Sequence, residues 1–434
     1  MKASAVLLLG AMAVGASVRG ATTEPARADE IRGLIEKLGS DDYQTRQQAQ
    51  DQLVRFGVDA KPMLQEMLAK ENDPEARTRA ESAIAQIDEN RVTGPSLVTL
   101  HVKDASPEVV LAELSRQGGY EIPTLPENLF KQPGMQWGKM TMDFDQQSFW
   151  SVFRAFCEKT GVRPNAMGND RKFVVMQGGD DSMQGPAVYS GAFMVVANSV
   201  TRSSSVNFAR DKIPTKSLNI QFSVFAEPKL NILGHDYYLR LSEAMDDRGN
   251  SLLMPVPQQY NSMGQDASSR WTLNAALAIP ETVGTRITRI KGVSRVLMQT
   301  KSERWDVPGI GSIPANGVSK SIGGRKYVVE DFKAAGVDSY QLKLTMIREG
   351  ARQSDWQQNG RGVRIIALDA EGKSLALNGW GGGGSNERLT YTYTFNQQNG
   401  MGGKTGPAKK LVIEVPTEVK EVDVPFEFKD LILP

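Results

Sequence analysis

The chain has 434 residues, more than one hydrophobic core usually organises, which predicts three or four domains. Its 51 Lys and Arg residues against 50 Asp and Glu residues leave a net charge of +1, so no overall field attracts nucleic acid or an anionic membrane, and nucleic-acid binding is disfavoured. Cys157 is the only cysteine, which excludes an internal disulfide, and its apolar neighbours Phe153 and Phe156 indicate a buried thiol.

Residues 1–20 have the layout of a secretory signal peptide. Lys2 precedes an apolar run over residues 3–14, and the small residues at 15–17 and Gly20 offer cleavage sites. The run is shorter than the roughly 20 residues of a spanning helix, and no cysteine near the cleavage region could carry a lipid. The alternative is a hydrophobic N-terminus that is retained. We therefore expect a periplasmic or secreted protein with no membrane span after signal removal.

Residues 21–92 are predicted to be helical and to contain a repeat. Five positions recur after 31 residues, with matching residue types: Asp42, Arg46, Ala49, Leu53 and Phe56 correspond to Asp73, Arg77, Ala80, Ile84 and Ile87. The two aspartates are expected to cap helices, and the two alanines to let neighbouring helices approach closely. The alternative is a plain helical spacer.

The motifs "DDYQTRQQAQDQLVRFG" and "DPEARTRAESAIAQI" resemble HEAT-type repeats. The resemblance covers about sixty residues and implies stacked helical pairs that offer a surface for binding another protein.

Residues 96–178 are predicted to form a small α+β module of two strand-helix units. Apolar and polar side chains alternate from residue 97, and Ser106 can cap the helix that follows. The pattern returns about forty residues later, which matches Asp104 to Asp145, Leu111 to Val152 and Gly119 to Gly161. A hairpin with its turn at residues 168–170 is expected to close the module.

The segments "VTLHVKDASPEVVLAELSRQGGYEI", "KMTMDFDQQSFWSVFRAFCEKTGV" and "KFVVMQ" resemble the secretin and TonB short N-terminal domain. That family implies a periplasmic module that contacts other envelope proteins and performs no chemistry. Because no secretin pore or outer-membrane barrel is visible downstream, secretion and uptake are not carried over with the resemblance.

Residues 188–310 and 322–434 are each predicted to form an antiparallel β-sandwich, because short alternating strands are separated by Gly, Pro, Asn and Asp. The two segments are expected to be duplicates: Asp-x-x-Gly turns begin at Asp246 and Asp369, and residues 305–308 correspond to residues 422–425. Hairpin chemistry accounts for these turns, with a calcium site as the alternative. The glycines at 381–384 are read as a flexible hairpin tip.

No catalytic, cofactor-binding or metal-binding residues are predicted. His101 and His235 lack neighbours at metal-ligand spacing, and neither a serine triad nor a reactive cysteine is indicated. Paired carboxylates brought together by the fold could still cleave a glycosidic bond, so a hydrolase stays an alternative.

Three aromatic side chains in polar loops, Trp356, Trp380 and Tyr260, are candidates for binding a ligand or a partner. The predicted fold class is multidomain α+β: a short helical repeat array, a two-unit strand-helix module and two β-sandwiches. The predicted function is that of an exported, non-catalytic scaffold or protein-interaction protein of the bacterial cell envelope, with envelope or periplasmic proteins as partners. The alternative is a protein that binds carbohydrate or peptidoglycan, with cell-wall glycan as the ligand.

Overall fold

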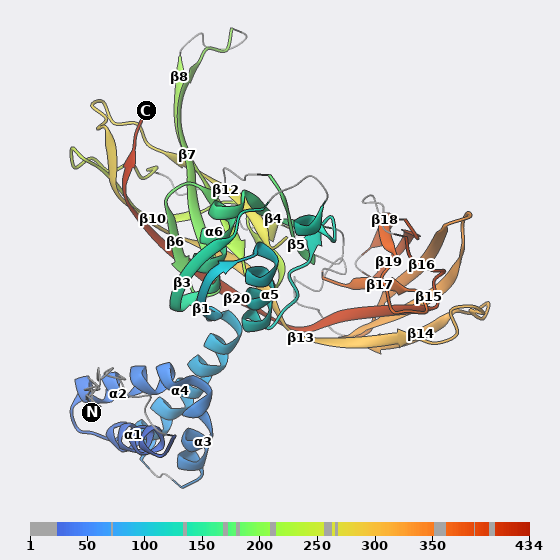
Figure 1. The fold of residues 1–434 in the computed structure, drawn as a ribbon, viewed down its shortest axis with the longest axis horizontal. Helices are drawn as coiled ribbons and strands as arrows, with labels where there is room; N and C mark the ends of the chain where they lie inside the picture. Colours follow the sequence, from blue (N-terminus) through green and yellow to red (C-terminus); the bar gives the residue numbers. More distant parts are fainter. Residues whose placement is uncertain are drawn as a thin grey trace, which may run out of the picture. The chain divides into compact units, whose positions relative to one another are not determined.

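The computed structural model describes residues 24–70, 73–132, 137–167, 172–178, 183–208, 214–255, 263–264, 268–350, 362–385, 387–398 and 404–434. The chain divides into two compact units, residues 1–91 and residues 92–434 (Figure 1). A small N-terminal helical region is followed by sheets that are mostly antiparallel, which agrees with the predicted multidomain α+β class.

The first unit is helical. Its elements are α1 (Glu24–Lys37), α2 (Tyr43–Phe56), the 3-10 turn η1 (Gly57–Asp59), α3 (Lys61–Lys70) and most of α4 (Pro74–Thr93). Its core is built from one apolar face of each helix: Ile31, Leu34, Leu38, Ala49, Leu53, Ala60, Leu64, Ala76, Ala80, Ala83 and Ile87. Ala49 and Ala80 are buried as expected, since a small side chain lets two helix backbones approach.

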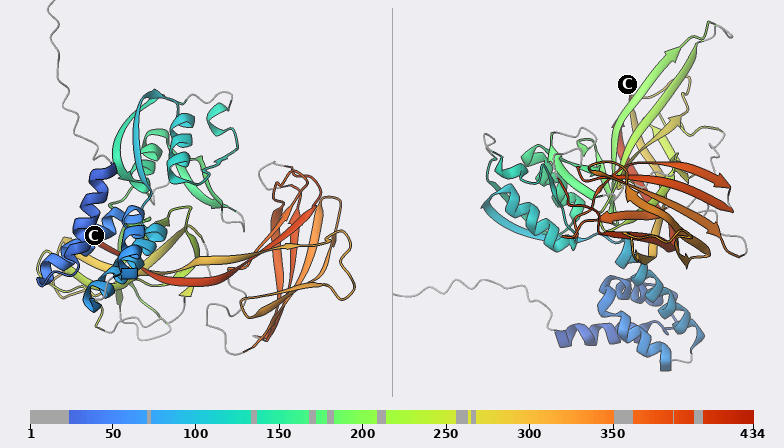
Figure 2. Two further views of the ribbon diagram at one scale, coloured as in Figure 1. Left: turned by 90° about the horizontal axis from the view of Figure 1, so that it is seen from below. Right: turned by 90° about the vertical axis from the view of Figure 1, so that its right-hand side faces the viewer.

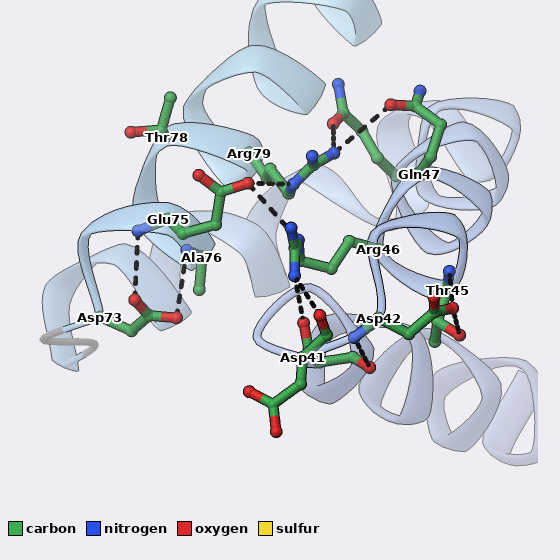
Figure 3. Close-up of polar contacts among 12 residues, drawn as sticks. Asp41, Asp42, Thr45, Arg46, Gln47, Asp73, Glu75, Ala76, Thr78 and Arg79 are labelled. Carbon is green, nitrogen blue, oxygen red and sulfur yellow. Dashed lines mark hydrogen bonds and ion pairs between the residues drawn. The ribbon is translucent and has the colours of Figure 1, made fainter.

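Two capping aspartates begin the helices of the repeat. The carboxylate of Asp42 accepts the backbone N–H of Thr45 at 2.8 Å, and that of Asp73 accepts the N–H of Glu75 at 3.1 Å (Figure 3). Arg46 donates to the carbonyl of Ser40 at 2.6 Å, while Arg77 donates to that of Leu68 at 2.7 Å. The predicted caps are therefore confirmed. Arg46 fixes the loop before its own helix, and Arg77 ties α4 to the last turns of α3.

The second unit begins with the α+β module. Its elements are β1 (Leu97–Ala105), α5 (Pro107–Gly118), β2 (Thr124–Leu125), η2 (Leu129–Lys131), β3 (Met140–Ser148), α6 (Phe149–Thr160), β4 (Val162–Met167) and β5 (Lys172–Gln177). β1 pairs with β3, and β5 lies between β2 and β4 in a three-stranded sheet. The two helices share one core with these sheets, and the predicted turn at 168–170 lies outside the described residues.

The two strand-helix units superpose on each other with an offset of 42 residues. Ser106 and Ser148 cap the two helices, and Gly119 and Gly161 end them in the left-handed conformation. Two residues before each cap the backbone has positive φ, 51° at Asp104 and 48° at Gln146. The match of Asp104 to Asp145 was therefore wrong by one residue, as was that of Leu111 to Val152. The register of β1 and β3 is irregular beside both positive-φ residues, so the two units keep the same spacing from that residue to the cap.

The remaining strands fall into two halves. The first half contains β6 (Ala187–Ser190), β7 (Phe193–Ser205), β8 (Thr215–Ala226), β9 (Asn231–Asp236), β10 (Arg240–Asp246), β11 (Met263–Gly264), β12 (Arg270–Leu277) and β13 (Arg286–Val307). The second half contains β14 (Val318–Ile322), β15 (Arg325–Ala334), β16 (Ser339–Arg348), β17 (Arg364–Leu368), β18 (Ala376–Ser385), β19 (Arg388–Asn396) and β20 (Lys410–Ile432). One sheet has the order β12-β8-β7-β6 and another has the order β18-β19-β16-β15-β14.

The same turn occurs in both halves. The carboxylate of Asp246 accepts the backbone N–H groups of Asn250 at 2.8 Å and Gly284 at 2.9 Å. Asp369, 123 residues later, accepts those of Lys373 at 2.8 Å and Gly406 at 2.9 Å. These contacts are the hairpin chemistry expected of Asp-x-x-Gly, since each carboxylate satisfies backbone donors that the turn leaves unpaired.

β13 and β20 are paired along almost their full length and connect the two halves (Figure 2). Ile290 and Val296 of β13 lie in the core of the first half, whereas Trp305 and Val307 lie in the core of the second. β20 does the reverse: its beginning packs in the second core and its residues from Val422 to Leu431 pack in the first. Each half therefore completes its core with a strand end from the other.

The module packs on the outer face of the β12-β8-β7-β6 sheet. Met194, Val196 and Phe225 of that sheet belong to the core of the module, while Val195 and Val224 beside them face the opposite core. The indole N–H of Trp150 donates to the carbonyl of Ala192 at 3.2 Å, and its ring lies 5.6 Å from that of Phe225. These strands are buried on both faces, unlike the half-buried strands that alternation predicts.

A buried carboxylate ties this junction together. Glu227 is 0% exposed, accepts the backbone N–H of Ser96 at 2.9 Å and pairs with Lys229 at 3.4 Å. Lys229 also donates to the carbonyl of Gly94 at 2.6 Å. The hydroxyl of Tyr120 donates to Glu227 at 3.4 Å, and burial together with that negative charge raises the pKa of Tyr120. The tyrosine therefore stays a neutral donor.

Candidate functional site

The outer edge of β1 is one of the strand edges that the α+β module leaves unpaired within the described residues. β1 pairs with β3 alone among the strands that the structure describes, so its other edge carries no neighbouring strand. Such an edge presents unpaired backbone N–H and C=O groups in a row, and it can accept an additional strand from another chain.

One end of this edge is already occupied by a side chain. The amide of Gln117 in α5 accepts the backbone N–H of Thr99 at 2.9 Å and donates to its carbonyl at 2.7 Å. Gln117 thus makes the two hydrogen bonds that a neighbouring strand would make. Backbone groups two residues apart on a strand point the same way, so those of His101 and Lys103 face the same edge beyond Gln117.

A groove of about 490 Å³ lies between this edge and α5. It is lined by residues 99–102 of β1 and by one face of the helix: Val109, Ala112, Glu113 and Arg116. Val109 is 55% exposed, and Ala112 is also exposed. The groove therefore combines free backbone groups with two exposed apolar side chains of the helix.

The charged groups around the groove are paired with one another. Two hydrogen bonds from Arg116, of 2.8 and 2.5 Å, lower the pKa of Glu113 to about 2, assisted by Gln117. His101 Nδ1 lies 2.5 Å from Asp143 on the neighbouring strand. Since Arg116 and Glu113 neutralise each other on the helix side of the groove, that side is suited to an extended, largely apolar peptide segment.

The helical unit displays a second surface with features of protein-binding sites. Tyr43 is 61% exposed, and the guanidinium groups of Arg46 and Arg79 lie 5.8 and 5.3 Å from the centre of its ring. Both arginines contact the carboxylate of Glu75, Arg79 at 2.7 Å and Arg46 at 3.4 Å (Figure 3). Fixed Tyr and Arg side chains are enriched among the residues that dominate binding energy at protein interfaces.

The three aromatic residues proposed from the sequence are not brought together in the described part of the chain. Trp356 and Tyr260 lie outside the described residues. Trp380 is 63% exposed, and its ring meets that of Tyr391 edge to face at 5.4 Å. The prediction of a loop was wrong here: Trp380 and the glycines at 381–384 form β18, which pairs with β19.

The histidines and the cysteine occupy different environments. His101 is exposed on the polar face of its strand, as predicted. His235 is buried and stacks on Trp271 at 5.1 Å, with its Nδ1 2.9 Å from the carbonyl of Asp236. Cys157 is buried in the module core. No group of three or more His, Cys, Asp or Glu side chains suited to a metal occurs within the described ranges.

Sequence reasoning missed the groove between β1 and α5. It named His101 and placed it correctly on a polar strand face, but an unpaired strand edge leaves no mark in the residue pattern. The one available signal was Val109, an apolar residue outside the i, i+3, i+4, i+7 stripe of the predicted helix.

No family model matches the chain, and no curated protein was found to match it. A solved structure described as the conserved domain protein from Bacillus anthracis is similar at 13% sequence identity, covering 56% of this chain and 89% of that chain with a TM-score of 0.18. At that score the two folds have too little in common to support a functional inference. Among the residues that the structure describes, no helix has the length and apolarity needed to cross a membrane.

Proposed function

We propose that this chain is an exported, non-catalytic protein of the bacterial cell envelope that binds other proteins by accepting an extended segment at the free edge of β1. The observation that carries the proposal is the groove beside that edge, with backbone groups on one side and Val109 and Ala112 on the other. Strand addition gives affinity through backbone hydrogen bonds and specificity through alternate side chains.

Two resemblances in the sequence support the same proposal. The α+β module has the strand and helix order of a secretin and TonB short N-terminal domain, a class of envelope-contacting modules. The helical unit has the caps and small buried residues expected of HEAT-type repeats, which bind proteins. We also propose that both β-rich halves are sandwiches, since side chains from two sheets meet in each core.

The incoming segment would pair with His101 and Lys103, since Gln117 occupies the edge at Thr99. Its inward side chains would lie against Val109 and Ala112 of α5, which requires small or medium apolar residues at alternate positions. Its outward side chains would lie beside His101 and would face solvent.

A proline substitution, which removes a backbone N–H, distinguishes pairing at the strand edge from binding to side chains on the same surface. His101→Pro removes the outward N–H and leaves pairing with β3 intact, because proline is tolerated on an edge strand when its nitrogen faces outward. His101→Ala is the matched control, since it also loses the contact with Asp143 but keeps the N–H. A photo-cross-linking residue at position 109 of the full-length protein, expressed in its own cell, reports the partner in each background.

We expect a discrete cross-linked adduct with the natural residue and with His101→Ala, and at least about a tenfold loss with His101→Pro. Circular dichroism and thermal melting of both variants should be alike, which shows that the module is folded. Equal adducts in the two variants, or no adduct at position 109 in any of them, would contradict strand addition at β1.

The carbohydrate alternative rests on one observation, the exposure of Trp380 beside Tyr391 on β18. Aromatic rings of this kind can stack on the apolar face of a sugar. Co-sedimentation of the purified protein with isolated peptidoglycan, compared with Trp380→Ala, tests it. Retention that disappears in the variant would favour a glycan-binding surface on the second half over a protein partner there.

A further inference from the structure

β13 and β20 relate the two halves by an internal two-fold symmetry. Met298 pairs with Lys420, a separation of 122 residues, and the equivalent turn glycines Gly284 and Gly406 are also 122 residues apart. A residue therefore pairs with its own counterpart at the middle of the ribbon. This is the arrangement of a symmetric dimer, here contained in one chain.

The paired strands β13 and β20 carry contacts between the halves in addition to the single covalent connection. One segment, residues 308–317, joins β13 to β14, and β13 pairs with β20 from Arg286 to Val307. Trp305 and Val307 are buried in the second core. Five apolar residues of β20 and one just after it are buried in the first: Val422, Val424, Phe426, Phe428, Leu431 and Leu433. Removing these strand ends would leave both cores open.

The charges on the two strands select which halves can pair. Arg289 contacts Glu427 at 2.9 Å, Arg295 contacts Glu421 at 3.0 Å, and Lys301 contacts Glu418 at 2.5 Å. In all three pairs the base lies on β13 and the acid lies on β20. A pairing of two first halves through β13 would lose these ion pairs and, at the same register, place Lys301 opposite Arg295, so the ribbon favours a first half with a second half.

We propose that residues 318–434 bind the first half as a partner would, through the exchanged ends of β13 and β20 and without need of the loop 308–317. A second copy of this chain can therefore supply either half. In this exchange the first half is occupied by residues 318–434 of a second copy, and the ion pairs between β13 and β20 disfavour a like half.

The test uses the full chain with a protease site inserted between Ala315 and Asn316, which are exposed, so that Ile310 and Ile313 keep their contacts with the second core. After cleavage the two fragments should elute together as a 1:1 complex with the thermal stability of a folded protein. Separation of the fragments in native buffer would overturn the proposal.

Charge-exchanged variants then test recognition between copies. One full chain with the protease site carries Arg289→Glu and Arg295→Glu on β13, and another carries Glu421→Arg and Glu427→Arg on β20. After cleavage, both are mixed, unfolded, refolded and weighed by native mass spectrometry. The pairings with opposite charges should exceed the like-charged pairings by about tenfold, since several ion pairs change sign together. Equal yields of all four pairings would overturn the selection by charge.

Discussion

The outer faces of the two equivalent sheets differ, although β12-β8-β7-β6 and β19-β16-β15-β14 are arranged in the same order. The second sheet has β18 as an additional strand. In the first half Met194, Val196 and Phe225 are buried beneath the α+β module. In the second half the corresponding face carries Lys326 and Lys343, beside a polar network in which Thr345 donates to Glu330 at 2.6 Å. The same framework was therefore adapted to hold a neighbouring module on one side and to face water on the other.

The residue that follows β8 in the first half and β16 in the second half shows the same divergence. The backbone N–H of Glu227 donates to the carbonyl of Ala192, and that of Glu349, 122 residues later, donates to the carbonyl of Gly324, both at 2.9 Å. Glu227 is enclosed by the module and paired with Lys229, whereas Glu349 is exposed. The same backbone position of the two halves thus carries a buried ion pair in the first half and a solvated carboxylate in the second.

The largest expected effect comes from placing a charge in the shared core. Phe225→Asp should lower the free energy of unfolding by about 4 kcal/mol or more, because it removes a ring packed in the module core and buries a carboxylate there. Arg270, whose guanidinium lies 5.4 Å from the centre of the Phe225 ring, offsets only part of that loss. Ile347 is the counterpart of Phe225 in the second half and is only partly buried, so Ile347→Asp should cost about 1 kcal/mol or less. Chemical denaturation of the two variants measures the difference; equal losses would show that the two outer faces are not distinct.

The next effect concerns the buried carboxylate. Glu227→Gln leaves Lys229 without its counter-charge and should destabilise the protein by about 3 kcal/mol. The same change at the exposed Glu349 should leave the melting temperature unchanged within error. A double variant, Glu227→Gln with Lys229→Met, should recover part of the loss, and an absence of recovery would argue that the ion pair itself is not the source.

Removing the aspartate of the turn that both halves share should have a smaller effect on stability, and the effect should be of the same size in each half. Asp246→Ala removes the acceptor of three backbone donors and should cost about 2 kcal/mol, and Asp369→Ala should loosen the second half in the same way. Local hydrogen exchange at residues 246–252 and 369–375 measures each loss. Opening of only one turn would break the equivalence of the halves.

The same turns predict a dependence on pH. Burial opposes ionisation of both aspartates, but their backbone hydrogen bonds outweigh it and leave the pKa of each lowered. A carboxyl with a lower pKa in the folded state stabilises the protein above its unfolded pKa of about 4, and that contribution is lost as the pH falls toward the folded value. Melting temperatures from pH 7 to pH 2 should decline less for Asp246→Asn than for the natural protein.

The smallest effect is expected on the solvated face. Glu330 pairs with Lys343 at 2.8 Å and with Arg388 at 3.5 Å, in partly exposed geometry. Glu330→Gln keeps an acceptor for Thr345 and should change the free energy of unfolding by about 0.5 kcal/mol, which salt should reduce further. A loss of stability as large as that of Glu227→Gln would mean that this face of the sheet is covered in the native protein.

Local signals in the sequence predicted local structure well. Ser106 caps a helix as expected, Asp42 and Asp73 do the same in the helical unit, and Cys157 is buried as its apolar neighbours indicated. Register was predicted less well. Residues 305–308 and 422–425 were matched at an offset of 117 residues, but the paired turns lie 122 to 123 residues apart, and the two segments end in different cores.

The sequence by itself determined the kinds of elements, their order and the fact of duplication, because capping, alternation and turn chemistry act over a few neighbouring residues. Only the tertiary structure decided which strand edge stays free beside α5, that Phe225 faces a second core, and that β13 and β20 exchange their ends. Those features depend on which surfaces meet, and an apolar residue in a strand has the same appearance in the sequence whichever core buries it.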